Sequence, residues 1–284
     1  MRLALFVAHL VDRRRPRFVG NDLDGVFARC RGWRRGRVGH FMNSRSEKEN
    51  LNMEFAPEGP KAIPLWVNGH AFLTVTDRFH DVVNPLTGEA PYRVPLCGAG
   101  EAAEAVASAR DAWPGWAALT ADARQAALEA LATALDRYAS HFAKLLGAET
   151  GFTEARALAE VAEVLVALRG DDVGESGVVA IVVDASRPLA GFAEAAAPVL
   201  RAGATIVVKP SPKAPSTAYA LCELSAQAEW PAGVLNLIQG DREAIDGLCA
   251  AGIDCLIYRG NAALGADVGA IADAAGMPYR MEAI

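Results

Sequence analysis

The chain has 284 residues, of which 52% are hydrophobic and 22% charged, and its formal net charge is −6. This composition is typical of a globular protein with a sizeable core. No apolar run approaches the ~20 residues needed to cross a bilayer, which argues against a membrane protein. The five cysteines form no C-x-x-C pair and the five histidines are dispersed. We therefore expect a reduced, cytoplasmic protein without a metal site.

The first 45 residues differ from the rest of the chain in charge. They contain eleven of the 28 Lys and Arg and three of the 34 acidic residues, a net charge of +8, which leaves −14 for the remainder. Such a segment fits an arm that binds nucleic-acid phosphates or a targeting segment. We favour a third interpretation, in which Met42 or Met53 is the true start, because regular patterning begins only near PLWVNG. We predict a basic extension over residues 1–52, either disordered or upstream of the true start, then one domain over residues 60–284, with no nucleic-acid partner.

Residues 64–96 alternate short β-rich runs with turn dipeptides. Asn68-Gly69 and Thr87-Gly88 are the clearest of these turns. Because such dipeptides connect antiparallel strands, this part of the chain predicts a small hairpin region.

Three helices are predicted after the hairpin region. The first covers about residues 100–113 and is expected to end at Pro114. The second has apolar residues at spacings of three and four and is expected to end at Gly147, a C-cap glycine. The third begins at a possible Thr153 N-cap and runs to Gly170. The apolar face of the second helix comprises Leu128, Leu131, Leu135, Tyr138, Phe142 and Leu145.

From Gly177 onward, apolar strands alternate with helices. The strands are VVAIVV, TIVV, VLNLIQ and IDCLIY, and helices are expected over residues 189–202, 216–228, 241–251 and 261–275. Continuous Val/Ile/Leu strands separated by helices predict an α/β fold with a doubly wound parallel sheet of four to five strands. This core spans residues 176–284.

Two features lie at strand ends, where ligands bind in doubly wound folds. Lys209 ends the TIVV strand, and a cation there can contact a bound anion or a ribose; the alternative is a solvated strand-end lysine. Gly260 and Gly265 stand where the fourth strand joins its helix, whose free N–H groups can bind phosphate. The alternative is a tight turn with an Asn cap. Together, on adjacent strand ends, they favour a nucleotide cleft.

GAGEAA, residues 98–103, matches the dinucleotide pattern G-x-G-x-x-G/A. Pro95 interrupts the run before it, and no second strand with an acidic end follows at the expected distance. Because the motif needs a strand, a turn and a helix around it, we interpret this stretch as a turn that caps a helix.

Residues 64–284 resemble the N-terminal, cofactor-binding half of aldehyde dehydrogenases. The resemblance rests on VNPLTGE, AVASARDAWPGW, ETG, APVLRAGATIVVKPSPKAPSTA, WPAGVLNLIQGD and IDCLIYRGNAALG, which follow the family's order. It implies a Rossmann-like fold, oxidation of aldehydes, and NAD or NADP as cofactor. Lys209 would contact the adenosine ribose or its phosphate, and Gly260-Asn261 would lie beside the pyrophosphate. The cofactor-binding positions that the resemblance implies are Lys209, Ser211, Gly240, Gly260 and Asn261.

The sequence departs from the family at catalytic positions. Family chemistry needs a cysteine nucleophile, a glutamate that activates water and an asparagine oxyanion donor. Glu282 matches the glutamate, whereas Ser186 stands where the asparagine would be, so we regard both as remnant positions. The nucleophile would belong to a domain that we expect to be absent.

The cofactor site departs as well. Pro212 replaces an acidic residue that binds ribose, Arg242 replaces a glycine, and Arg259 replaces a threonine. We therefore expect a truncated protein, inactive alone, that binds a nucleotide or a protein partner at the face left open by the missing domain. The alternative is half of a split or frameshifted NAD(P)-dependent aldehyde dehydrogenase. A degraded product without a stable fold is disfavoured, because caps and periodicities remain mutually consistent.

Overall fold

The computed structural model describes residues 59–283, which lie in a single compact unit. The basic extension predicted over residues 1–52 falls outside the described residues. Within the described part, no helix is both long and apolar enough to cross a membrane.

The core of the fold is a seven-stranded sheet in the order β10-β9-β6-β7-β8-β2-β3. The first five strands in this order are parallel, and β2 and β3 run antiparallel at one edge. The α/β fold with a doubly wound parallel sheet is thus confirmed. The strands are β10 (Tyr279–Ala283), β9 (Cys255–Gly260), β6 (Val178–Val183), β7 (Thr205–Lys209), β8 (Leu235–Leu237), β2 (Leu65–Val67) and β3 (His70–Phe72).

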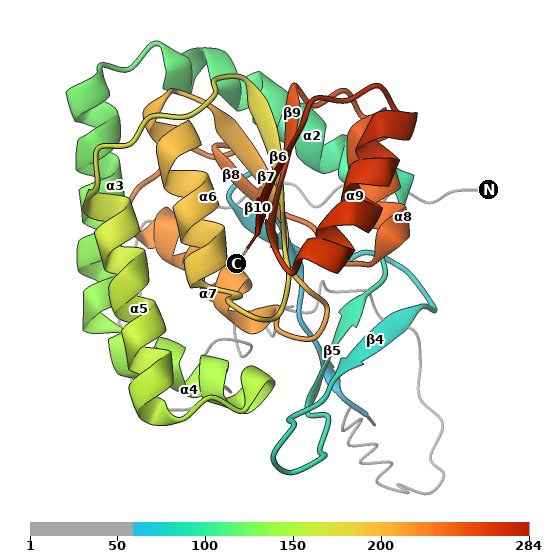
Figure 1. Cartoon of the computed structure of the whole chain (residues 1–284). Helices are drawn as coiled ribbons and strands as arrows, with labels where there is room; N and C mark the ends of the chain where they lie inside the picture. Colours follow the sequence, from blue (N-terminus) through green and yellow to red (C-terminus); the bar gives the residue numbers. More distant parts are fainter. Residues whose placement is uncertain (1–58, 284) are drawn as a thin grey trace, which may run out of the picture. The chain divides into compact units, whose positions relative to one another are not determined.

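Helices cover both faces of this sheet (Figure 1). One layer contains α6 (Ala190–Arg201) and α7 (Ser216–Gln227), and the other contains α2 (Ala99–Ala117), α8 (Arg242–Ala250) and α9 (Ala262–Ala274). Strands β6 and β7 are buried along their whole length because they lie between the two layers. Strand β6 has β7 on one side and β9 on the other. The chain therefore reverses its direction of progress between β6 and β9, where doubly wound folds place their ligand crevice.

The hairpin region takes part in two sheets. Strands β2 and β3 meet at Asn68 and Gly69, whose φ angles of 53° and 76° are those of a type I′ turn. A second sheet has the order β1-β5-β4, in which β4 and β5 form an antiparallel pair. The predicted hairpin region is confirmed, and it also extends the main sheet. The strands of the second sheet are β1 (Lys61–Ala62), β4 (Phe79–Val82) and β5 (Tyr92–Pro95).

Four helices, not the predicted three, lie between the hairpin region and β6 in the described chain. The helix expected to run to Gly147 is divided at Tyr138 into α3 (Ala121–Arg137) and α4 (Ala139–Thr150). Both halves bury their apolar residues on the same side, so periodicity alone could not reveal the break. Gly151, with φ 75°, ends α4 by donating its N–H to the Gly147 carbonyl. The fourth helix is α5 (Glu154–Arg169).

Helix α2 continues past Pro114, which was expected to end it. Trp116 lies beyond the proline and is 1% exposed; its indole N–H donates to the Leu200 carbonyl at 3.0 Å. Its ring also stacks on Trp230 with centroids 5.6 Å apart. Packing of this tryptophan offsets the backbone hydrogen bond that the proline removes. At the other end, Gly98 precedes α2 and donates its N–H to Glu101, so the interpretation of GAGEAA as a helix-capping turn is confirmed.

Candidate functional site

The candidate site lies along the carboxyl ends of the parallel strands. Ser186 follows β6, Lys209 ends β7, Gly260 ends β9, and Glu282 lies on β10. The structure brings Ser186, Gly260 and Asn261 together around one further side chain, Asp184. Glu282 joins a separate group of ion pairs, and Lys209 stands one strand away, opposite Val182 of β6.

Asp184 was missed by sequence reasoning, and its side chain connects the segments that follow β6 and β9. Its carboxylate accepts the Asn261 N–H at 2.6 Å and the Ser186 N–H and hydroxyl at 2.8 and 2.5 Å. The hydroxyl of Tyr258 lies 3.4 Å from the same carboxylate. Burial, followed by the charge of Asp184, raises the pKa of Tyr258 above its ordinary value. In DASRPL, Asp184 stands two residues before Ser186, a spacing that is typical of a turn in which the aspartate accepts a backbone N–H. This spacing could have drawn attention to Asp184.

Asn261 is the N-cap of α9. Its side-chain oxygen accepts the N–H groups of Ala263 at 2.8 Å and Leu264 at 3.4 Å. Because Asp184 accepts the N–H of Asn261 itself, several N–H groups that a helix start normally offers to a ligand already have acceptors. The interpretation of Asn261 as a helix cap is therefore confirmed.

A chain of ion pairs, which we call the arginine–glutamate network, runs through the elements around β9 and β10. Its members are Glu163, Arg187, Glu194, Arg259, Glu282, Arg280 and Glu175. Arg259 pairs with Glu194 of α6 and with Glu282 of β10. The network therefore fastens helices α5 and α6 to the last two strands of the sheet.

Glu282 and Ser186 are both engaged within the protein. One carboxylate oxygen of Glu282 accepts from Arg259 and the other from Arg280 at 2.9 Å. A general base needs a carboxylate that can reach a substrate proton or a water, and both oxygens here are held by guanidinium groups. The Ser186 hydroxyl donates to Asp184, so its hydrogen is not directed at a substrate oxygen.

Lys209 is the most unusual of the expected cofactor residues. It is 5% exposed and has no hydrogen-bond or ion-pair partner among the described residues. Burial lowers its pKa to about 8, while the nearby charge of Asp241 acts in the opposite direction. An unpaired buried ammonium is costly, so a bound anion would stabilise it.

The other expected cofactor residues have local roles. The Ser211 hydroxyl accepts the Lys213 N–H at 3.3 Å, as in a turn. Gly240 has φ 132°, and a Cβ there would lie 3.0 Å from the backbone nitrogen of Cys97. The glycine thus allows the β8–α8 loop to approach the end of β5. Arg242, one of the departures from the family, is exposed on α8 and lies 3.7 Å from Asp246.

The four described cysteines do not provide a reactive thiol. They are free and buried, and burial raises the pKa of every one of them. A nucleophilic cysteine needs a stabilised thiolate and access to a substrate. Their surroundings are those of core residues. The four are Cys97, Cys222, Cys249 and Cys255.

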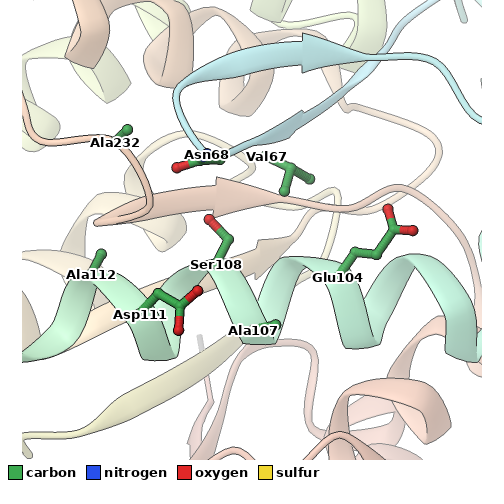
Figure 2. A pocket seen from close by; sticks show the side chains of 8 residues that line it. All are labelled: Val67, Asn68, Glu104, Ala107, Ser108, Asp111, Ala112 and Ala232. Atoms are coloured by element: carbon green, nitrogen blue, oxygen red, sulfur yellow. The ribbon is translucent and has the colours of Figure 1, made fainter. Parts of the chain in front are cut away.

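A shallow groove of about 550 Å³ lies between α2 and the β2–β3 turn (Figure 2). The Ser108 hydroxyl and the backbone N–H of Asn68 both donate to the side-chain oxygen of Asn236 at 3.0 Å. Glu104 and Asp111 line the same wall. In this groove the described residues include no cysteine, no histidine and no cation, and none of the described residues forms a group of three or more metal ligands. The site at the carboxyl ends of the parallel strands is therefore the stronger candidate.

The family model for the aldehyde dehydrogenase family matches residues 72–170 and 176–283. The chain belongs to the aldehyde dehydrogenase family. It is 34% identical to N-succinylglutamate 5-semialdehyde dehydrogenase of Klebsiella pneumoniae over 224 residues, which are 71% of this chain and 45% of that protein. It is 32% identical to mitochondrial succinate-semialdehyde dehydrogenase of Oryza sativa over 203 residues, 63% of this chain and 38% of that protein. The chain thus spans less than half the length of these aldehyde dehydrogenases.

Solved aldehyde dehydrogenases share the fold. Lactaldehyde dehydrogenase from Escherichia coli superposes with a TM-score of 0.72 and 25% identity, over 79% of this chain and 52% of that one. A putative methylmalonate-semialdehyde dehydrogenase from Sinorhizobium meliloti, solved with NAD, gives a TM-score of 0.73 at 23% identity, over 79% of this chain and 50% of that one. The second likeness concerns the fold alone.

The family implies an NAD(P) cofactor, and the described residues fit only part of such a ligand. Lys209 fits such a ligand, because its buried ammonium would gain an anionic or hydroxyl partner. The start of α9 does not fit, because a pyrophosphate there would meet the Asp184 carboxylate, which already accepts the Asn261 N–H. Two like charges at contact distance repel strongly where the carboxylate is buried, as that of Asp184 is. The described residues therefore do not fit the pyrophosphate of a dinucleotide.

Proposed function

We propose that this member of the aldehyde dehydrogenase family functions by binding and not by redox catalysis. The observation that carries the proposal is the state of Glu282, whose two carboxylate oxygens are held by Arg259 and Arg280. The buried thiols of the described cysteines support the same conclusion.

A protein partner at the β10 edge is the binding role that we favour. Strand β10 pairs with β9 and forms one edge of the main sheet in the described chain. Leu264 and Met281, which lie near this edge, are 45% and 44% exposed. An open strand with apolar neighbours can accept a further strand from another protein.

We also propose a cytoplasmic location, which the free thiols support.

A turnover assay tests the non-catalytic proposal. The full chain would be incubated with NAD⁺ or NADP⁺ and the semialdehydes of its relatives, succinate semialdehyde among them, while the absorbance of reduced cofactor is followed. We expect no rate above the protein-free blank. A rate that disappears in Glu282→Gln would overturn the proposal, because it would show that this carboxylate still acts on a substrate.

A second candidate is one half of an NAD(P)-dependent aldehyde dehydrogenase, completed by another chain that supplies the cysteine. Buried, unpaired Lys209 favours it, since such a residue is stabilised by a bound anion. This candidate requires saturable binding of NADH or NADPH that is lost in Lys209→Ala. Lys213→Ala is the matched control, because Lys213 lies on the loop that follows β7 and is exposed. Absence of binding in the wild type would exclude this candidate.

A further inference from the structure

The start of α9 has the geometry of an anion site. The helix has 13 residues and begins at the carboxyl end of β9, beside the point where the sheet reverses its winding. Backbone N–H groups and the helix dipole favour a negative charge at such a position. In this chain, the negative charge comes from the protein itself, since Asp184 lies 2.6 Å from the Asn261 nitrogen.

The side chain of Asp184 packs closely against the turn between β9 and α9. A Cβ at Gly260 would lie 2.3 Å from Cγ of Asp184 and 2.7 Å from the Tyr258 hydroxyl. The carboxylate therefore fills the space beside the β9–α9 turn. With φ 151°, Gly260 also adopts a conformation that favours glycine. A second anion beside this turn would have to displace the carboxylate.

The cations around the start of α9 do not balance the negative charge of a phosphate. Arg259 is next to the turn, but its terminal nitrogens pair with Glu194 and Glu282. Arg187 is likewise held, by Glu163 at 2.7 Å and by Glu194 at 2.6 Å. Lys209, the cation expected to contact the cofactor, stands on β7, which is separated from β9 by β6.

We propose that Asp184 is an internal ligand that replaces a dinucleotide pyrophosphate at the start of α9, so that this chain excludes NAD(P). The inference rests on the proposed binding function and deepens it, because it excludes NAD(P) as a ligand of this protein. It rests on Asp184 and Gly260, whereas the non-catalytic proposal rests on Glu282. The two can therefore fail separately: turnover would overturn the proposed function, and dinucleotide binding without turnover would overturn only this inference.

The test is a titration of the full chain with NADH, followed by energy transfer from tryptophan to the nicotinamide. We expect no saturation with the wild type. Asp184→Asn keeps a side-chain oxygen for the Asn261 N–H but removes the charge that repels the phosphates. We expect this variant to bind NADH saturably, on the order of tenfold more tightly, or better, than the weakest affinity that the wild-type titration could detect.

Asp254→Asn is the matched control. Asp254 also accepts a backbone N–H that joins β6 to β9, that of Val178 at 2.7 Å, but it lies at the opposite, amino end of these strands. Removing its charge should leave NADH binding unchanged. Saturable binding by the wild type would overturn the inference. A gain shared by both variants, or a gain in neither, would also overturn it, because the charge of Asp184 would then not be the cause.

The NADH titration tests the inference only if each variant is folded. Each would be checked for a cooperative thermal unfolding transition before the titration. If Asp184→Asn fails this check, Asp184→Ser supplies a smaller neutral acceptor at the same place. The same outcomes then apply to the serine variant.

Discussion

At the scale of single residues, Glu149 shows how burial shapes the pH dependence of stability. It lies on α4, and its carboxylate accepts the Ser216 N–H at 3.1 Å as well as the Ser216 hydroxyl. Burial raises its pKa from 4.5 to about 8, and the two bonds from Ser216 only partly oppose this. The folded state therefore prefers the protonated carboxyl, whose contribution to stability is fully present below pH 4.5 and is lost as the pH rises to about 8.

We therefore expect the free energy of unfolding to fall between pH 5 and pH 8. The loss should be roughly 2 kcal/mol, which allows for the partial exposure of the side chain. Glu149→Gln should flatten this dependence, as measured by urea unfolding at a series of pH values. Glu154→Gln, at an exposed position on α5, should leave it unchanged. An identical slope in Glu149→Gln and the wild type would contradict the assignment.

Gly260 provides a second prediction at this scale. An alanine there would have its Cβ 2.3 Å from Asp184 and would adopt an unfavourable φ of 151°. Gly260→Ala should cost about 2–4 kcal/mol in the free energy of unfolding. Gly100→Ala is the control, because Gly100 is exposed within α2 and a Cβ there meets nothing within 4 Å. That substitution should stabilise by about 0.5–1 kcal/mol. Equal effects of the two substitutions in urea unfolding would be inconsistent with this geometry.

Sequence alone indicated part of the candidate site. Lys209 and Asn261 could be found because a strand end and a helix start are local patterns. Asp184 could not be assigned its role, because that role depends on a contact with Asn261, 77 positions later. The pairing of Glu282 with Arg259 is likewise a contact between two strands, which no local spacing reveals.

At the scale of elements, the start of α6 depends on a side chain from another helix. Glu160 of α5 is fully buried, and one of its oxygens accepts the N–H groups of Leu189 and Ala190 at 3.0 and 3.1 Å. This carboxylate takes the part of an N-cap, although it lies 29 residues before Leu189. Its other oxygen is buried without a partner among the described residues.

Removing this cap should destabilise the protein. Glu160→Ala leaves two buried N–H groups without an acceptor, so we expect a loss of about 2–4 kcal/mol. Glu160→Gln keeps an acceptor and removes the buried charge, and should therefore lose less than the alanine variant. Midpoints of thermal unfolding for the two variants would show this order. The reverse order would mean that the charge, and not the hydrogen bonding, matters at this position.

Elements were predicted best where local pattern and packing agree. The four strand–helix pairs from Val178 onward needed only the alternation of apolar runs and caps. The continuation of α2 past Pro114 depends instead on the burial of Trp116 against Leu200. The attachment of β2 to β8 rests on the pairing of Trp66 with Leu237. Such long-range contacts decide the final arrangement and leave little trace in local sequence.

At the scale of the whole molecule, the arginine–glutamate network connects elements that are far apart in the chain. Arg259 is its central member, since it joins α6 to β10. Arg259→Met would leave Glu194 and Glu282 with one fewer cation in a half-buried setting. We expect a loss of about 1–3 kcal/mol. A double-mutant cycle with Glu194→Gln should give a coupling free energy well above zero, whereas additivity would show that the pair contributes nothing.

The two aspartates that join β6 to β9 have a further consequence for the whole molecule. Asp254 ties the beginning of β6 to β9, and Asp184 ties the end of β6 to the turn after β9. Opening the centre of the sheet requires both carboxylates to release their backbone partners together with the ladder between them. The amide protons of β6 should therefore exchange with solvent only when the whole domain unfolds, and so their exchange rates would report its global stability.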